Sequence, residues 1–277
     1  MSTKVKKLLL KARKQVFGEM LGNNPSLFQG EGFEFTELRE YVYGDDVRKI
    51  DWKTTAKLGK PFIKIYREER ELNVVTAVML GGSSYFGTVR QKSEVMAELV
   101  ALVGFSALKN SDLFTNIIFA DKLYTMSRPN KKFFAIEDAL SKIESFEMLG
   151  KESNYKALSD TLYKRLKRKS LLFIIADFVG DIDLGLLSKK HDVVAIIVRD
   201  KFEEKPQELG FMRLMDMESR VSFEGVVGGS ELKRYEKAVV ENDEKLFKHF
   251  KKNGVRYVKV YTHEEPYLKL AKLLGAK

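Results

Sequence analysis

The chain has 277 residues, of which 44% are hydrophobic and 32% are charged, a balance typical of globular proteins and unlike that of disordered chains. It contains no cysteine, which excludes disulfide bonds and thiolate metal ligands. The formal net charge of +10 comes from lysines and arginines interleaved with glutamates, which favours a solvated surface or a basic face for an acidic protein partner over a nucleic-acid interface. The longest apolar run near the start, Leu8–Leu10, is too short to span a membrane, so we expect a cytoplasmic protein.

The first 71 residues predict a helix followed by two strands. Residues 3–20 place apolar side chains on one side and lysines on the other, the pattern of an amphipathic helix. Phe33 and Phe35 alternate with polar residues, as in a half-buried strand. A turn is predicted at Tyr43–Asp46, and a second strand at Phe62–Tyr66. We expect this extension to pack against the domain that follows it.

Residues 72–277 alternate short apolar runs with longer helical patterns. This alternation indicates βαβ units, hence a Rossmann-like α/β fold with a mostly parallel sheet. The segment 201–229 interrupts the rhythm with glycines and short strand-like pieces, and we expect a surface excursion there. The predicted strands are 72–80, 114–120, 122–126, 171–176, 193–198 and 257–261, and the predicted helices are 89–109, 133–143, 155–167, 182–188, 230–252 and a last one from about 265.

The single tryptophan, Trp52, lies between Asp51 and Lys53. Burial of its ring would contribute about 2–3 kcal/mol, and its N–H would then need an acceptor. We therefore expect Trp52→Ala to cost about 3–5 kcal/mol. One interpretation is a structural clasp with paired charges around the ring, and the other is a docking site for a partner or ligand. The residues concerned are Arg39, Gly44, Asp45, Asp46, Arg48, Asp51 and Trp52.

The same stretch carries a family resemblance. The pattern GEGFEF-x2-LREY-x2-GDDVRKIDWK-x-TAK, from Gly30 to Lys57, resembles the signature of the von Willebrand factor A-like proteins encoded beside MoxR-type AAA ATPases, the domain of unknown function 58 family. The resemblance implies a three-layer sandwich of von Willebrand factor A type at 72–277 with an N-terminal extension at 1–71. It also implies a cytoplasmic, non-enzymatic adaptor that acts with a MoxR-type AAA ATPase in folding, assembly or cofactor loading of a client complex.

In the von Willebrand factor A fold, three loops at the carboxyl ends of the strands form a metal-ion-dependent adhesion site. Its Asp-x-Ser-x-Ser motif falls here on Met79, Gly81 and Ser83, so the aspartate is missing, while its second aspartate matches Asp177. Because Mg²⁺ requires hard oxygen ligands, we expect a degenerate site with at most weak Mg²⁺ binding. The residues left at this top face are Gly81, Ser83, Ser84, Ser153, Asn154 and Asp177, with Ser153 or Asn154 at the threonine position.

Two alternatives remain open for Asp177. It is also a candidate cap for the turn or helix that follows it, as Ser83 and Ser84 are for theirs. Alternatively, a neighbouring carboxylate such as Asp121 or Glu152 completes a metal site with it.

Catalytic motifs are sparse. His191, His249 and His263 are far apart and show no metal-ligand spacing, which predicts surface histidines. Neither a Gly-x-Ser-x-Gly elbow nor a phosphate-binding Gly-x-x-x-x-Gly-Lys-[Ser/Thr] loop occurs, so we expect no enzyme.

One alternative belongs to a different functional class. Asp46, Asp51 and Lys53 match the Asp…Asp-x-Lys arrangement of metal-dependent nucleases, in which two carboxylates hold Mg²⁺ and the lysine contacts the phosphate. The positive net charge is compatible with a nucleic-acid-binding or nuclease module. Clustering of basic side chains on one face near Asp51 would favour this reading.

Overall fold

The computed structural model describes residues 2–18, 35–66, 71–208 and 210–275. The chain divides into two compact units, one of residues 1–28 with 72–277 and the other of residues 29–71, and each is described by itself. Helix α1 (Thr3–Gly18) belongs to the larger unit, whereas the rest of the expected N-terminal extension forms the smaller one. Residues 30–34, where the family-like signature begins, lie outside the described residues.

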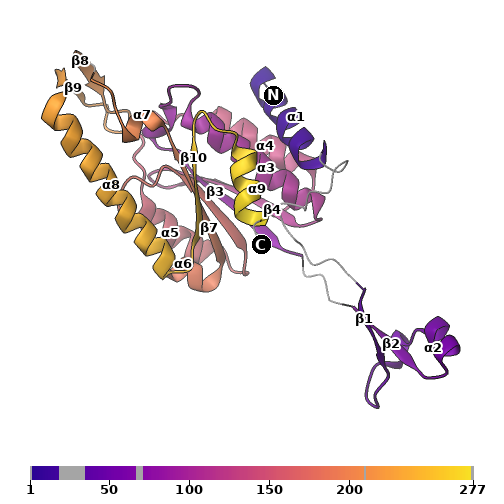
Figure 1. Cartoon of the computed structure of the whole chain (residues 1–277). Helices are drawn as coiled ribbons and strands as arrows, with labels where there is room; N and C mark the ends of the chain where they lie inside the picture. The colour runs from indigo at the N-terminus through magenta and orange to yellow at the C-terminus, as the bar shows by residue number, and fades with distance from the viewer. Residues whose placement is uncertain (1, 19–34, 67–70, 209, 276–277) are drawn as a thin grey trace. The chain divides into compact units, whose positions relative to one another are not determined.

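The larger unit is built on a six-stranded sheet with the order β10-β7-β6-β3-β4-β5 (Figure 1). Five strands are parallel, and β5 pairs antiparallel with β4 at one edge. The mixed α/β fold with a mostly parallel sheet is therefore confirmed. The strands are β3 (Asn73–Met79), β4 (Leu113–Phe119), β5 (Leu123–Met126), β6 (Leu171–Ala176), β7 (Asp192–Arg199) and β10 (Arg256–Tyr261).

Helices cover both faces of this sheet. Alternate residues of β3 divide between two cores, with Val74 and Val78 facing one and Val75 and Ala77 facing the other. The first core is completed by α1, α3 (Lys92–Lys109), α4 (Phe133–Glu144) and α9 (Pro266–Gly275), and the second by α5 (Tyr155–Arg165), α6 (Gly185–Lys190) and α8 (Gly229–Lys252).

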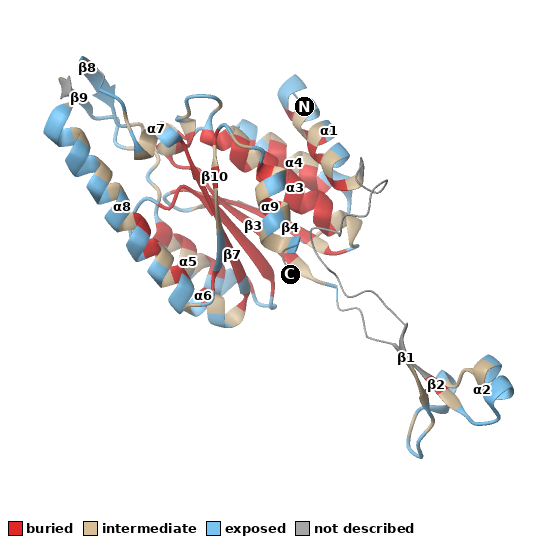
Figure 2. Cartoon of the chain, viewed as in Figure 1, coloured by how far each residue is buried: buried red, intermediate tan, exposed pale blue. Residues whose placement is uncertain are grey.

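The central strands are buried on both sides, as Figure 2 shows in red. All six residues of β6 are buried, which explains its uninterrupted apolar sequence Leu-Leu-Phe-Ile-Ile-Ala. His191, just before β7, is 2% exposed, so the prediction of a surface histidine is wrong there. It follows α6 directly and leads into a strand buried between the helical layers.

The predicted excursion consists of the short helix α7 (Lys201–Glu204) and an antiparallel hairpin, β8 (Gly210–Met215) with β9 (Ser222–Val227). None of the described helices is long and apolar enough to cross a membrane.

The smaller unit contains an antiparallel pair, β1 (Phe35–Glu40) and β2 (Phe62–Tyr66), with a 3-10 turn η2 (Val47–Lys49) and the helix α2 (Trp52–Leu58) between them. Gly44 adopts a φ of +107°, a conformation open to glycine, and forms the predicted turn. Ile63 is 4% exposed, and the other described side chains of this unit are half-buried or exposed. A unit of this size encloses too little apolar surface to form a core.

Candidate functional site

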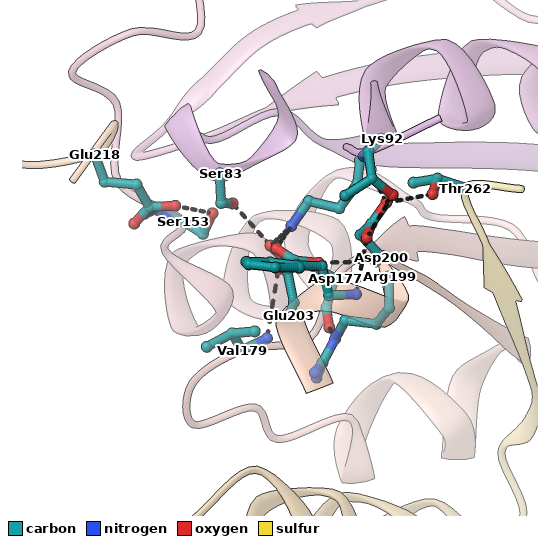
Figure 3. A network of polar contacts seen from close by, with 12 residues as sticks. Ser83, Lys92, Ser153, Asp177, Val179, Arg199, Asp200, Glu203, Glu218 and Thr262 are labelled. Atoms are coloured by element: carbon teal, nitrogen blue, oxygen red, sulfur yellow. Dashed lines mark hydrogen bonds and ion pairs between the residues drawn. The ribbon is translucent and has the colours of Figure 1, made fainter. Parts of the chain in front are cut away.

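The candidate site lies where the strand order of the sheet reverses. Strand β4 lies on one side of β3 and β6 on the other, so the segments that follow β3 and β6 diverge at their carboxyl ends. Crevices of this kind are the usual binding sites of open α/β sheets. Ser83, in the 3-10 turn η3 (Gly82–Tyr85) after β3, meets Asp177, the residue after β6 (Figure 3).

Asp177 is 4% exposed and accepts hydrogen bonds from three separate elements. The Ser83 hydroxyl donates to Oδ2 at 2.7 Å, and the Tyr155 hydroxyl donates to Oδ1 at 2.8 Å. The Lys92 ammonium lies 3.0 Å from Oδ2. Burial alone would raise the pKa of Asp177, but the charge of Lys92 and these hydrogen bonds lower it to about 2. The carboxylate is therefore ionised at all physiological pH values.

Lys92 has a fully buried side chain and is the first residue of α3. Besides Asp177, it pairs with Glu203 of α7 at 2.6 Å. Burial alone would lower the pKa of Lys92, but the two carboxylates outweigh it and raise this pKa above its ordinary value. The site thus contains a permanent cation supplied by the chain itself.

Glu203 also links this pair to the next strand end. Its second carboxylate oxygen accepts the Asp200 backbone N–H at 2.9 Å, which closes a capping box around α7. The Asp200 carboxylate in turn accepts the Thr88 N–H at 2.8 Å and the Thr262 hydroxyl. These contacts tie the ends of β7 and β10 to the loop before α3.

Arg199 connects the site to the opposite helical layer. Its guanidinium donates to the Asp177 carbonyl and pairs with Asp243 of α8 at 3.3 Å, and Lys259 pairs with Asp243 at 2.6 Å. The site is consequently held from both faces of the sheet.

The structure brings part of the sequence-predicted top face together. Ser83 contacts Asp177 directly, whereas Ser84 is buried within η3. Asn154 caps α5, because its side-chain oxygen accepts the Ala157 N–H at 2.9 Å. Ser153 donates to Glu218 at 3.0 Å.

The capping alternative for Asp177 accounts for only one contact. The Val179 N–H lies 3.4 Å from Oδ1, longer than the contacts with Ser83, Lys92 and Tyr155. The main partners of Asp177 are therefore distant in sequence.

The carboxylates considered as additional metal ligands are engaged or solvated. Asp121 accepts the Tyr124 hydroxyl at 2.7 Å on the β4–β5 hairpin, and Glu152 is exposed. Among the described residues, no cluster of three or more histidine, aspartate or glutamate side chains is arranged to hold a metal ion.

The charged residues of the signature stretch do pair locally. Arg39 bonds Asp45 at 2.9 Å, and Asp45 also accepts the Val42 N–H at 2.8 Å. Arg48 bonds both oxygens of Asp46 at 3.1 Å. These hydrogen bonds lower the pKa values of both aspartates, chiefly through the Val42 N–H for Asp45 and through the Arg48 side chain for Asp46. They shape the turn around Gly44.

Trp52, in contrast, is 69% exposed, so the predicted burial of its ring within a clasp is wrong. The ring belongs to the first residue of the seven-residue helix α2, and among the described side chains of this unit only Ile63 is buried. Asp51 stands at the N-cap position of α2 without a side-chain capping hydrogen bond, and it accepts the Thr54 hydroxyl at 2.8 Å. Lys53 is exposed. The carboxylates of the nuclease-like arrangement, Asp46 and Asp51, therefore both serve local structure.

Sequence reasoning missed Lys92, Tyr155, Glu203 and Glu218. A signal existed for Lys92, because a lysine at the first position of a helix opposes the helix dipole and is unfavourable there without a carboxylate partner. For Glu203 the local signal is the capping box with Asp200, which does not reveal its pairing with Lys92. No local signal marks the contact of Glu218 with Ser153, which lies 65 residues away.

Comparison with known proteins gives a family match. The model of the family described as "Protein of unknown function DUF58" matches residues 37–245. An uncharacterized protein of Mycobacterium bovis, Mb1516, is 27% identical over 221 residues, which cover 77% of this chain and 70% of the relative. The uncharacterized protein Rv1480 of Mycobacterium tuberculosis matches to the same extent.

Solved structures show a more distant likeness. The conserved hypothetical protein BatB of Bacteroides thetaiotaomicron is 11% identical, with a TM-score of 0.45 over 74% of this chain and 97% of that one. An aerotolerance-related membrane protein of Bacteroides fragilis is also 11% identical, with a TM-score of 0.46 over 74% of this chain and all of that one.

Proposed function

Because the chain belongs to the DUF58 family, we propose that it is a non-enzymatic adaptor that docks on a MoxR-type AAA ATPase. In this account the unit formed by residues 29–71 is the docking element. The larger unit is a von Willebrand factor A-type domain that engages the client whose folding, assembly or cofactor loading the ATPase drives.

The observation that carries the proposal is the exposure of large apolar side chains on the signature unit. Tyr43 is 99% exposed, Trp52 69%, and Val47 and Leu58 58% each. Aromatic residues of this kind supply most of the binding energy at protein interfaces. The exposure of Tyr43 and Trp52 on a small unit is therefore typical of a docking element.

Charge supports a protein partner for this unit. Residues 35–66 contain seven basic and five acidic residues. Arg39, Arg48 and Lys60 form ion pairs with acidic residues of the same unit. These ion pairs neutralise part of the positive charge of the unit. The remaining modest positive charge suits steering toward an acidic protein surface.

The top face supports recognition without a resident metal ion. Mg²⁺ bound to Asp177 would lie about 2.1 Å from a carboxylate oxygen. The Lys92 ammonium already lies 3.0 Å from Oδ2, the oxygen that also accepts the Ser83 hydroxyl. The residues of the site therefore do not fit a divalent cation, and Lys92 supplies the positive charge in its place.

Isothermal titration of the purified protein with the MoxR-type ATPase encoded nearest its gene tests the proposal. We expect Trp52→Ala and Tyr43→Ala each to weaken binding at least tenfold, as interface aromatics do. Leu268→Ala is the matched control, because Leu268 of α9 is 67% exposed but lies on the other unit. Equal affinities for the wild type, Trp52→Ala and Tyr43→Ala would refute docking through the signature unit.

A further inference from the structure

The β8–β9 hairpin is held to the larger unit mainly by its tip. Its two strands pair with each other, and no other described helix or strand packs extensively on either. Several of its apolar side chains are exposed, and the hairpin is mostly pale blue in Figure 2. These exposed side chains are Phe211 (75%), Leu214 (44%), Met215 (49%) and Val221 (65%).

The tip, residues 216–220, lies on the loops at the carboxyl edge of the sheet. The Met217 carbonyl accepts the Gly150 N–H at 2.9 Å. The Glu218 carboxylate accepts the Ser153 hydroxyl at 3.0 Å and the Ser153 N–H at 3.4 Å (Figure 3). The Arg220 guanidinium also donates to the Leu149 carbonyl at 3.0 Å, so three residues of the tip contact this loop.

Two glycines make room for this close approach. A Cβ on Gly82 would lie 2.1 Å from the Met217 carbonyl oxygen, and a Cβ on Gly81 would lie 2.6 Å from a Glu218 carboxylate oxygen. Backbone cannot yield to contacts as short as the first. Gly81, which was predicted as part of the degenerate metal site, and Gly82 therefore leave the space that the turn occupies.

The turn keeps its shape through its own residues. The Asp216 carboxylate accepts the Glu218 N–H at 2.9 Å and the Ser219 hydroxyl. The Ser219 hydrogen bond is the largest cause of the lowered pKa of Asp216. The turn therefore has hydrogen bonds of its own in addition to its contacts with residues 149–153.

We propose that the surface made by Gly81, Gly82 and residues 150–153, here named the turn receptor, binds a tight turn with a carboxylate side chain. In this structure the chain's own residues 216–220 occupy it. A protein partner that presents an acidic turn of the same shape takes their place. The Lys151 ammonium lies over the Tyr124 and Phe146 rings, 5.1 and 5.6 Å from their centroids, so the receptor recognises the carboxylate through the N–H and hydroxyl of Ser153. This proposal is independent of docking through residues 29–71.

A cyclic peptide with the sequence of residues 215–221 serves as the probe, with fluorescence anisotropy as the readout. We expect Glu218→Ala to bind it at least tenfold more tightly than the wild type, because occupancy by the internal turn reduces apparent affinity. Adding Ser153→Ala to that variant should remove the gain. Glu224→Ala is the matched control, because Glu224 is an exposed hairpin glutamate that pairs with Arg213. Equal binding by all four proteins, or none, would overturn the proposal.

Limited trypsin digestion gives a second, peptide-free readout. Cleavage after Arg220 should become several-fold faster in Glu218→Ala and in Gly82→Ala than in the wild type, and stay unchanged in Glu224→Ala. If Glu218→Ala and Glu224→Ala are cleaved at the same rate, the tip does not hold the hairpin and the receptor is not built for it.

Discussion

The Lys92 ammonium and the Asp177 carboxylate form an ion pair of 3.0 Å, and their side chains are 0% and 4% exposed. The pair joins the first residue of α3 to the end of β6, at the point where the strand order of the sheet reverses. Glu203 extends it to α7. A buried lysine thus lies beside Ser83 and Asp177, where the family resemblance predicted a degenerate metal site.

Lys92→Met should destabilise the protein strongly. The substitution leaves Asp177 buried without its counter-ion, and breaking one side of a buried pair costs about 3–5 kcal/mol. Lys142→Met is the control, because Lys142 pairs with Asp138 at 2.6 Å on the surface, where such pairs contribute less than about 1 kcal/mol. Guanidinium denaturation followed by circular dichroism measures both. A loss below about 1 kcal/mol for Lys92→Met would show that the pair is not stabilising.

Removal of the lysine should expose a weak metal site. In Lys92→Ala, the carboxylates of Asp177 and Glu203 and the Ser83 hydroxyl remain without a cation, and such oxygens suit Mg²⁺. Excess Mg²⁺ should therefore raise the melting temperature of this variant relative to EDTA, with no effect on the wild type. Stabilisation of the wild type by Mg²⁺, abolished by Asp177→Ala, would contradict the account.

The pair also predicts how stability depends on pH. The pKa of Asp177 falls from 3.8 to about 2, so its stabilisation is present above about pH 4 and is lost as the pH falls toward 2. The pKa of Lys92 is raised from 10.5, so its stabilisation is present below that value and is lost at higher pH.

Melting temperatures measured from pH 2 to 11 check this profile. In Lys92→Met the acid limb should move to higher pH, because the positive charge that helps to keep Asp177 ionised is gone. If both proteins lose stability at the same acidic pH, other carboxylates cause the acid unfolding.

Trp52→Ala should have little effect on folding. The ring is 69% exposed, so its truncation is expected to cost less than about 1 kcal/mol, not the 3–5 kcal/mol expected for a buried ring. Thermal denaturation of the variant measures this directly. A decrease of several kcal/mol in the free energy of unfolding would show that Trp52 has a structural role.

Much of the fold could be predicted from local patterns. The strand Leu171–Ala176 has the predicted bounds because six consecutive apolar residues suit a strand buried on both faces. The helix predicted at 89–109 begins at Lys92, since the residues before it form the loop that contacts Asp200. The type and the approximate bounds of such a strand or helix follow from the pattern of its own residues.

The site was less predictable because its contacts are long-range. Ser83 and Asp177 were predicted to converge from the topology of parallel strands, and they do. The cation beside them was not predicted, since a lysine in a charged chain resembles any surface lysine until its burial is known. The expected burial of Trp52 failed for a related reason. The apolar character of a side chain does not distinguish burial in a hydrophobic core from a position on a surface that binds a partner protein.

Binding of the protein to the MoxR-type ATPase tests the central claim most directly. Titrations in ATP with Mg²⁺, in ADP with Mg²⁺ and without nucleotide should show affinities that depend on the nucleotide. Lys92→Met should keep that dependence, because the proposed docking element is the unit of residues 29–71, which does not contain Lys92. No binding under any of these conditions, with retention of the protein on a nucleic-acid column instead, would contradict the adaptor account.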